Sequence, residues 1–414
     1  MPDRLAVDTR LHYVSEGDSA SGKLLLFLHG FPELAYSWRK VMPLLAAQGF
    51  WCVAVDLPGY GQSPPPNSAK YDVAVQRSNN EAVNYDDDVK PWCRAHTAHL
   101  LATFVNTICN AHGRKAKVDC LVGHDMGSPQ GGAFALLYPE LIERVILMSA
   151  PWTGIQPLAD GESPDLPRLE AQANCFGKDF AKDLEPRDGE QDVVKVLRAL
   201  AHSGHKHYQH HYCEPNAAST LACKGESPIT FEHALRCYYY LKSGHSWMAP
   251  RPLESWDSSV LKSLPGYYLL PPGCATMQDY LAAMIRSPNH KDELSLEAME
   301  SAMSSWFTKD EIQVYLRAYT QTGFQSSLNY YRSMTSTLDK IVLAQAMPKD
   351  SNGQLTMPLL FIAGSHDWGV YQQPGALQTM KDNGAQCVLI DGAGHWVQQE
   401  KPGEVVDAIL KFIQ

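Results

Sequence analysis

The sequence predicts an α/β fold in which a mostly parallel central sheet, flanked by helices, is interrupted by a large, mainly helical lid. Short apolar runs alternate with stretches of helical spacing up to Ala150, and this alternation is typical of a parallel sheet. From Pro151 to about Ala346 the alternation is absent, and the chain is aromatic, rich in histidine and mainly helical in its spacing. The alternation resumes at Pro358, so the two flanking parts should form one sheet.

Each expected element rests on its own pattern. Apolar runs predict buried strands at residues 24–29, 51–56, 118–122 and 144–148, and helical spacing predicts helices at 92–112 and 127–138. The last part of the chain predicts strands at 358–363 and 386–390, with helices near 375–383 and from 403 onward. Inside the insertion, residues 294–305 and 310–320 have helical spacing. We therefore assign residues 1–150 and 355–414 to the core and residues 151–354 to a helical lid domain.

Composition and charge exclude several classes of protein. With 414 residues, 44% of them apolar and 19% charged, the chain can bury a large core and should be neither disordered nor fibrous. Its formal charge of -10 repels phosphate backbones and anionic membrane surfaces, so nucleic acid is not an expected partner. We find no signal-peptide pattern and no apolar run that could span a bilayer, and expect a cytoplasmic protein. No pattern indicates an oligomeric state.

A short motif after the predicted strand at 118–122 is the first candidate for chemistry. The segment Gly123-His124-Asp125-Met126-Gly127 lies where a strand passes into a helix, and a Gly-x-nucleophile-x-Gly turn at such a junction projects one side chain above the sheet. The two glycines lack the Cβ atoms that would clash in so sharp a turn. Asp125 is therefore the candidate nucleophile. The alternative is that Asp125 caps the helix that follows.

Two further segments end predicted strands on the far side of the insertion. Asp367 closes the strand at 358–363, and His395 follows the strand at 386–390. Because the carboxyl ends of parallel strands meet at one edge of a sheet, both side chains should lie near Asp125. The chain order of nucleophile, acid and histidine is that of the triad on an α/β-hydrolase fold. Taken alone, Asp367 is consistent with an ordinary turn residue and His395 with a buried core histidine. Together with Asp125, however, they favour a catalytic site.

Two more motifs accompany these residues. They are His29-Gly30-Phe31-Pro32-Glu33 and Asp56-Leu57-Pro58-Gly59-Tyr60-Gly61. With the turn around Asp125 and the segments that carry Asp367 and His395, they make the chain resemble the epoxide hydrolases of the α/β-hydrolase superfamily. The resemblance covers both ends of the chain and parts of the lid. Haloalkane and haloacid dehalogenases share much of the set, so the motifs imply an aspartate nucleophile more specifically than they imply a substrate.

An aspartate nucleophile implies a reaction in two steps. A carboxylate attacks saturated carbon without a base to activate it, so Asp125 points away from ordinary esterases and towards an ester between enzyme and substrate. His395, oriented by Asp367, would take a proton from the water that cleaves this ester. The resemblance implies that the backbone N–H groups of Phe31 and Met126 form the oxyanion hole. This chemistry needs no cofactor.

The leaving group separates the two candidate chemistries. An opening epoxide leaves as a basic alkoxide and needs an acid, for which a phenol with a pKa of about 10 is suited, whereas a halide needs none. The epoxide hydrolase family places two tyrosines in the lid. The resemblance assigns these to Tyr331, in Leu328-Asn329-Tyr330-Tyr331-Arg332, and to Tyr208, followed by Gln209. The alternative is ordinary aromatic packing, since the chain has 19 tyrosines.

Three residues are candidates for binding the small-molecule substrate: Gln209, Trp152 and Pro32. The aromatic residues of the lid suggest that this substrate is bulky or aromatic. The resemblance also implies a cis peptide bond before Pro32. Trp152 fits core packing equally well. Halide-binding relatives usually offer a Trp after the nucleophile or an Asn in the first turn, where this chain has Met126 and Phe31, so a dehalogenase is disfavoured.

A metal site is not expected. The histidine cluster at 202, 205, 207, 210 and 211 has no cysteine pair or carboxylate to complete a ligand set.

The predicted function is the opening of an epoxide by water to a vicinal diol, through an Asp125 ester. The alternatives are a dehalogenase with the same nucleophile, a cyclase in which a substrate hydroxyl replaces water, and a non-catalytic binding protein on this fold.

Overall fold

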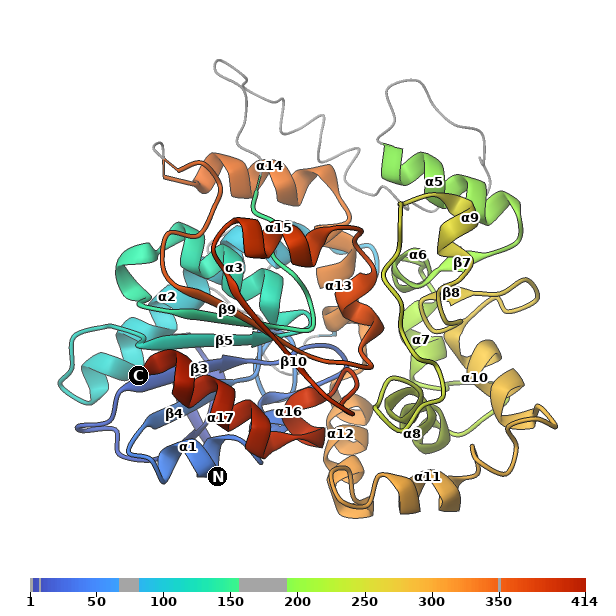
Figure 1. The fold of residues 1–414 in the computed structure, drawn as a ribbon, viewed down its shortest axis with the longest axis horizontal. Coiled ribbons are helices and arrows are strands. Elements are labelled where there is room, and N and C mark those ends of the chain that lie inside the picture. Colours follow the sequence, from blue (N-terminus) through green and yellow to red (C-terminus); the bar gives the residue numbers. More distant parts are fainter. Residues whose placement is uncertain (1–2, 7–8, 67–81, 156–191, 349–350) are drawn as a thin grey trace.

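The computed structural model describes residues 3–6, 9–66, 82–155, 192–348 and 351–414. Figure 1 shows a central sheet with helices on both faces, and beside it a second group of helices drawn in green, yellow and orange. Residues 156–191 of the predicted lid lie outside the described residues. Among the helices that are described, none is long and apolar enough to cross a bilayer.

The central sheet has eight strands in the order β1-β2-β4-β3-β5-β6-β9-β10. From β4 to β10 every neighbouring pair is parallel, whereas β1 and β2 pair antiparallel at one edge. The six predicted strands are all present, as β3 (Leu24–Leu28), β4 (Trp51–Val55), β5 (Cys120–His124), β6 (Val145–Met148), β9 (Leu359–Gly364) and β10 (Gln386–Ile390). Val145 of β6 pairs with Leu359 of β9, so the parts before and after the insertion form one sheet, as predicted.

The two edge strands β1 (Asp3–Ala6) and β2 (Leu11–Glu16) were not predicted. In β2 two polar residues, His12 and Ser15, are buried among the apolar ones, so the run lacks a clear apolar pattern. Each has a partner: His12 Nδ1 lies 2.7 Å from a carboxylate oxygen of Asp56, and Ser15 accepts a hydrogen bond of 3.0 Å from the indole N–H of Trp51. Satisfied polar groups can be buried at little cost, which is why hydrophobicity alone did not show this strand.

Helices cover both faces of the sheet, and the central strands are therefore buried on both sides. Alternate residues of β3 divide between the two faces: Leu24, Leu26 and Leu28 face α2 (Arg94–Ala111) and α3 (Gly127–Leu137), whereas Leu25 and Phe27 face α1 (Met42–Ala46) and α17 (Pro402–Ile413). Continuous apolar strands of this kind are typical of parallel sheets with two covered faces. The helix α15 (Ala376–Asp382) packs beside β10, as the sequence predicted.

The insertion is mainly helical, as predicted. Its described elements are α5 (Asp192–His202), β7 (Lys206–His207), α6 (Tyr208–Tyr212), α7 (Ala217–Leu221), α8 (Phe231–Leu241), α9 (Ser258–Leu261), β8 (Leu269–Leu270), α10 (Met277–Arg286), α11 (Leu296–Ala302), α12 (Lys309–Thr322), α13 (Gln325–Met334) and α14 (Thr337–Ala346). Two of these helices begin with a capping box, in which Thr276 pairs with Asp279 and Thr308 with Glu311.

The end of the insertion packs on the core. In Figure 1 α14 lies on the core side of the molecule, and Asp339 of α14 accepts hydrogen bonds of 2.7 Å from both the backbone N–H and the Nε of Arg94 in α2. The strands of the sheet all lie outside the range 151–354. The exact division at these residues stays a prediction.

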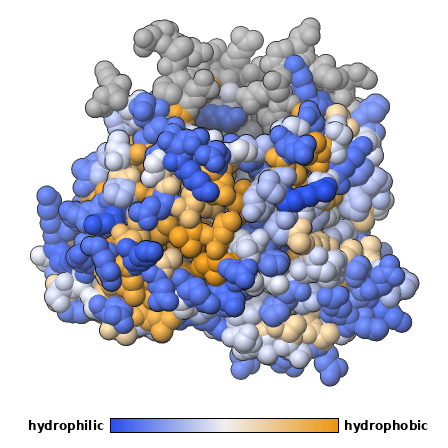
Figure 2. All heavy atoms as spheres, in the orientation of Figure 1, coloured by the Kyte–Doolittle hydropathy of each residue, from blue (hydrophilic) through white to orange (hydrophobic). Residues whose placement is uncertain are grey.

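Figure 2 shows the outer surface in the same orientation. Polar residues cover most of this face, and an apolar area lies over the core where Figure 1 places β10. This strand forms one edge of the sheet, and Val388 and Leu389 on it are exposed.

Candidate active site

Asp125 stands in a sharp turn between β5 and α3. Its φ angle of 48° lies in the left-handed region, where a residue with a side chain is strained. The turn is closed by glycines: a Cβ on Gly123 would lie 2.3 Å from the carbonyl oxygen of Gly127, and a Cβ on Gly127 would lie 2.4 Å from that of Leu28. A Cβ on Gly30 would lie 2.4 Å from the Cβ of Asp125 itself. The sequence motif therefore reflects backbone contacts that no larger residue allows.

The carboxylate of Asp125 has two different neighbours. Oδ1 accepts a hydrogen bond of 2.9 Å from the backbone N–H of Phe31, and Oδ2 lies 3.2 Å from Nε2 of His395. One oxygen is thus held by a backbone donor, while the other faces the imidazole. Met126, the second predicted oxyanion donor, follows directly at the start of α3 and is buried.

His395 and Asp367 lie where the sequence predicted, at the carboxyl ends of neighbouring strands. Nδ1–H of His395 donates to Oδ1 of Asp367 over 3.0 Å, and the same oxygen accepts a hydrogen bond of 2.7 Å from the backbone N–H of Gly369. Both side chains are almost completely buried. The structure therefore brings Asp125, His395 and Asp367 into one chain of contacts, with the imidazole between the two carboxylates.

The protonation states of Asp125 and His395 follow from the charges around them. Burial alone would raise the pKa of Asp125, but the hydrogen bond and charge of His395, with Lys242 and His124, lower it well below its usual value. Burial and Lys242 lower the pKa of His395, yet Asp367 and Asp125 more than offset them and raise it to about 9. Asp125 is therefore ionised, and in the resting site it faces an imidazolium.

A buried network lies beneath the turn that carries Asp125. Glu33 accepts hydrogen bonds from the backbone N–H of Gly30 (3.0 Å) and from the amides of Gln398 and Gln399 (both 2.9 Å), and it contacts Nδ1 of His124 at 2.6 Å. The other ring nitrogen of His124 donates to the carbonyl oxygen of His395 over 2.8 Å. This network fixes the Gly30 turn relative to the backbone of His395.

The two predicted tyrosines come from different lid helices and pack against each other, and Tyr331 also packs on Phe31. Tyr208 begins α6 and Tyr331 lies in α13, with ring centroids 6.1 Å apart, and the Tyr331 ring packs edge-on to Phe31 at 5.4 Å. Burial, followed by the charge of Asp125, raises the pKa of both phenols above its usual value. Both hydroxyls therefore stay protonated and can donate to an oxygen atom.

The predicted substrate-binding residues have different surroundings. The peptide bond between Phe31 and Pro32 is cis, as the resemblance implied. The amide of Gln209 donates to the hydroxyl of Tyr208 over 3.4 Å. Trp152 is buried against α3, where a Cβ on Gly132 would lie 2.3 Å from its ring. A contact of Trp152 or Gln209 with substrate stays a prediction.

An apolar cavity of about 30 Å³ opens beside Phe31 and Pro32. This is room for about two water molecules. Aromatic and aliphatic side chains of the lid form its walls: Tyr212, Leu221, Phe231, Ala234, Leu235, Tyr238, Met277, Leu281 and Phe324, with Gln278 as the polar member. An apolar substituent fits these walls better than a charged one.

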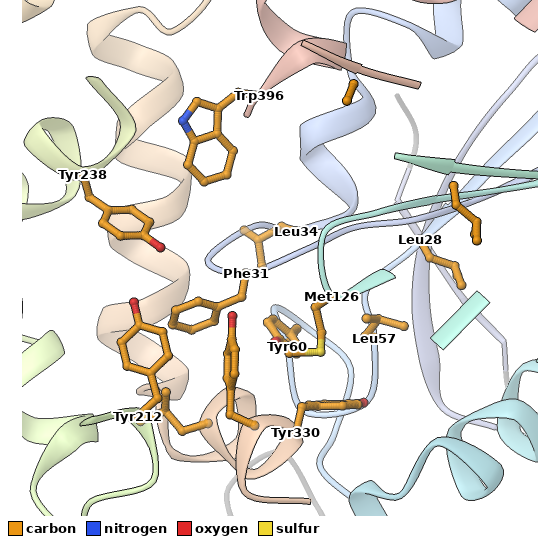
Figure 3. Close-up of a cluster of buried hydrophobic side chains, with 14 of the residues drawn as sticks. Leu28, Phe31, Leu34, Leu57, Tyr60, Met126, Tyr212, Tyr238, Tyr330 and Trp396 are labelled. Atoms are coloured by element: carbon orange, nitrogen blue, oxygen red, sulfur yellow. The ribbon is translucent and has the colours of Figure 1, made fainter. Parts of the chain in front are cut away.

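Sequence reasoning missed three residues beside the site, Tyr212, Tyr238 and Lys242. Figure 3 shows the hydroxyls of Tyr212 and Tyr238 pointing toward one another beside Phe31. Lys242 ends α8, and its Nζ lies 3.4 Å from the hydroxyl of Tyr238. The available signal was weak: a lysine four residues after a tyrosine, at the end of an aromatic stretch, is equally typical of a surface helix.

The histidine cluster of the lid has contacts of its own. His211 Nδ1 lies 2.9 Å from Glu214, and its Nε2 accepts a hydrogen bond of 3.3 Å from the backbone N–H of Met277. His207 packs on Tyr208 and Trp256, at centroid distances of 4.9 and 6.1 Å. In the described part of the chain, no group of three or more His, Cys, Asp or Glu side chains is placed to hold a metal ion.

Comparison with known proteins agrees with this topology. Residues 23–196 match the family model described as the alpha/beta hydrolase fold. The sheet order and the strand-to-helix turn that carries Asp125 belong to the same architecture. The chain has the α/β-hydrolase fold.

Relatives of this chain are similar to it over almost their whole length. Epoxide hydrolases A and B of Mycobacterium tuberculosis are 27% and 26% identical to it, over 100% and 98% of this chain and 97% and 95% of their own chains. Among solved structures, an epoxide hydrolase from an endophytic Streptomyces superposes with a TM-score of 0.64 at 23% identity, covering 100% of this chain and 95% of that one. The resemblance found in the sequence motifs therefore extends through the lid.

Proposed function

We propose that this protein is an epoxide hydrolase that works through a covalent ester of Asp125. The proposal rests on the arrangement of four side chains: an ionised carboxylate, a buried imidazole, and two protonated phenols of the lid. The curated relatives with similarity along the whole chain carry the same name. A carboxylate nucleophile opposite phenolic acids suits the displacement of an alkoxide.

In the first step Oδ2 of Asp125 is the attacking atom. Oδ1 is occupied by the N–H of Phe31, whereas Oδ2 has no backbone donor among its described contacts and lies on the side of His395. Oδ2 forms a bond to an epoxide carbon, the ring C–O bond breaks, and the ring oxygen takes a proton from Tyr331 or Tyr208. The product is an alkyl ester on Asp125, and the tyrosinate regains its proton from solvent.

In the second step water cleaves this ester at the carboxyl carbon. Once Asp125 is an ester, His395 releases its Nε2 proton to solvent. The neutral imidazole then takes one proton from the water at Nε2, while Asp367 stabilises the imidazolium so formed through Nδ1–H. The water oxygen bonds to Cγ of Asp125, and the negative charge passes to Oδ1, which the N–H of Phe31 already faces. Collapse breaks the ester C–O bond, and the departing alkoxide takes the proton from His395 to give a vicinal diol.

The lid tyrosines favour an epoxide over a halide as substrate. A halide leaves as a weak base, so a dehalogenase has no use for two buried phenols above the nucleophile. The walls of the cavity beside Phe31 and Pro32 favour an apolar substituent next to the reacting carbon.

The experiment that tests the proposal traps the ester. We would mix the His395→Ala variant with a panel of aryl and alkyl epoxides, and in parallel with alkyl halides of matching shape, and measure the intact mass. The Asp125→Asn variant is the blank. An adduct of epoxide mass on the peptide that contains Asp125 supports the proposal. Adducts from halides alone would assign the chain to the dehalogenases, and an epoxide adduct on another residue would refute the assigned nucleophile.

A further inference from the structure

The lysine at the end of α8 is enclosed by aromatic rings. Lys242 is 4% exposed, and its Nζ lies 5.1, 5.0 and 5.4 Å from the ring centroids of Tyr238, Tyr268 and Trp396. Each ring presents the negative side of its quadrupole to a cation at such a distance. Burying an ammonium costs free energy unless its surroundings stabilise the charge. Three ring faces around the ammonium of Lys242 therefore indicate a site that stabilises a positive charge.

This charge is not neutralised by a direct ion pair. In the described part of the chain no carboxylate lies within 4 Å of Nζ, and its hydrogen-bond contact is the hydroxyl of Tyr238 at 3.4 Å. Burial lowers the pKa of Lys242 below its usual value, and the charges of Asp125, Asp367 and Glu33 offset this effect only in part. The cation therefore acts on the catalytic carboxylates through space rather than by contact.

The backbone fixes the position of Lys242 relative to His395. The N–H of His395 donates to the carbonyl oxygen of Lys242 over 2.8 Å, and a Cβ on Gly394 would lie 2.4 Å from that oxygen. Trp396, one wall of the aromatic cage, follows His395 directly and donates its indole N–H to the carbonyl oxygen of Tyr239 over 2.9 Å. The imidazole and the ammonium are thus held in one rigid unit of lid and core.

We propose that Lys242 is a positioning residue whose buried cation holds His395 in its neutral, proton-accepting form once Asp125 has become an ester. The inference rests on the proposed function. In the resting site two carboxylates face His395, and its proton is retained. When Oδ2 of Asp125 is bound to substrate, one of these negative charges is gone. The pKa of His395 is then set mainly by two charges: Asp367 raises it and favours the imidazolium, whereas Lys242 lowers it and favours the neutral ring.

Other groups around His395 belong to several elements, and none takes the place of Lys242. His124 of β5 has its ring centroid 5.0 Å from that of His395, but its Nδ1 contacts the carboxylate of Glu33 at 2.6 Å, so this ring is paired directly with an acid, whereas Lys242 is not. Glu400 of α16 (Val397–Glu400) accepts hydrogen bonds from the backbone N–H groups of Gly244, Gly394 and Trp396. Further charged or titratable groups in this part of the described structure are Glu33 beneath the turn and the phenols of Tyr238 and Tyr268, whose pKa burial raises well above its usual value.

The first test reads the imidazole directly and needs no substrate. We would titrate the ring resonances of His395 by NMR, assigned by their loss in His395→Gln, in the wild type and in Lys242→Met, Lys242→Gln and Lys242→Arg. The two neutral variants should raise the midpoint by about one pH unit, and Lys242→Arg should leave it within a few tenths of a unit. The control is Lys262→Met, the same change at the exposed C-cap of α9 in the lid.

The second test follows the decay of the ester against pH in a single turnover. In Lys242→Met the acid limb of this rate should move up by about one unit, so that the variant is about tenfold slower at low pH and reaches the wild-type rate at high pH. Lys242→Gln provides the same comparison if Lys242→Met does not fold. A rate lowered equally at every pH, with an unchanged NMR midpoint, would overturn the inference and leave Lys242 a packing residue.

The two tests separate this inference from the proposed function. If the wild type forms no ester with any epoxide, the proposed function fails, while the NMR midpoints still decide whether Lys242 controls His395. If the ester forms but the midpoints of the neutral variants equal that of the wild type, the proposed function stands and the role of Lys242 is refuted.

Discussion

The backbone N–H of Phe31 donates a hydrogen bond of 2.9 Å to Oδ1 of Asp125, across 94 residues of sequence. This contact leaves Oδ2 as the oxygen without a backbone donor among its described contacts. It also places a donor where negative charge would develop on Oδ1 during ester hydrolysis. One backbone group thus serves both steps of the proposed reaction, and the close approach is possible because Gly30 carries no Cβ.

The change Asp125→Asn should abolish ester formation and lower turnover of an epoxide by at least about a thousandfold. The amide keeps the acceptor that faces Phe31 and has nearly the same size, so the fold should be retained. Thermal unfolding would check this, and turnover would be followed by diol formation. A variant that keeps more than a tenth of the wild-type rate, with no hydrolysis of the amide back to Asp125 by mass, would contradict the assigned nucleophile.

Removing a lid hydroxyl should slow ring opening selectively. Tyr331→Phe and Tyr208→Phe each remove a phenol facing the site, and each should lower the rate of ester formation from an epoxide by about 10- to 100-fold. The double variant should be almost inactive. Stopped-flow fluorescence would measure this step. The matched control is Tyr280→Phe, a buried lid tyrosine that lies against Gly266; an equal loss in the control would point to lid packing instead.

The imidazolium in the resting site has a consequence for stability. The pKa of His395 is raised to about 9 in the folded protein, from 6.5 in a free histidine, because Asp367 and Asp125 outweigh burial and Lys242. A raised pKa of this kind stabilises the fold fully below pH 6.5, and the contribution is lost as the pH rises towards 9. It amounts to about 3 kcal/mol for this buried group. Urea denaturation at pH 6 and pH 9.5 would measure the loss, and His395→Gln should remove most of it.

Most of the sheet and the grouping of Asp125, Asp367 and His395 could be predicted from sequence, because both depend on local patterns. Strands buried on two faces are continuous apolar runs, and the turn around Asp125 needs glycines at fixed positions. β2 was missed because His12 is buried there with a partner 44 residues away, on Asp56. Such a pair is set by tertiary structure and has no local signature.

The aromatic cage could not be predicted for the same reason. Its rings come from α8, from the segment before β8 and from the turn after β10, which are distant in sequence. Lys242 alone is an ordinary residue at a helix end, and only the packing of the lid on the core places it beside His395. The motif residues were found because each carries its own backbone requirement, whereas Lys242 does not.

Two glycines near Asp125 make a last prediction, because Gly123 in the turn and Gly131 in the following helix should respond in opposite ways to the same substitution. A Cβ on Gly123 would lie 2.3 Å from the carbonyl oxygen of Gly127, a backbone atom that cannot move without opening the turn. Gly123→Ala should therefore destabilise the fold by about 3 kcal/mol and remove activity.

Gly131, in the helix that follows, is the matched control. The nearest atoms to a Cβ there would be side-chain atoms of Leu121 and Leu28, at 3.5 Å each, which is ordinary contact. Because alanine is the better helix former, Gly131→Ala should raise the free energy of unfolding by up to about 1 kcal/mol and leave activity unchanged. Denaturant titration and diol formation would compare the two variants. Equal stability of Gly123→Ala and wild type would show that the turn can relax, and that its strain is not needed to present Asp125.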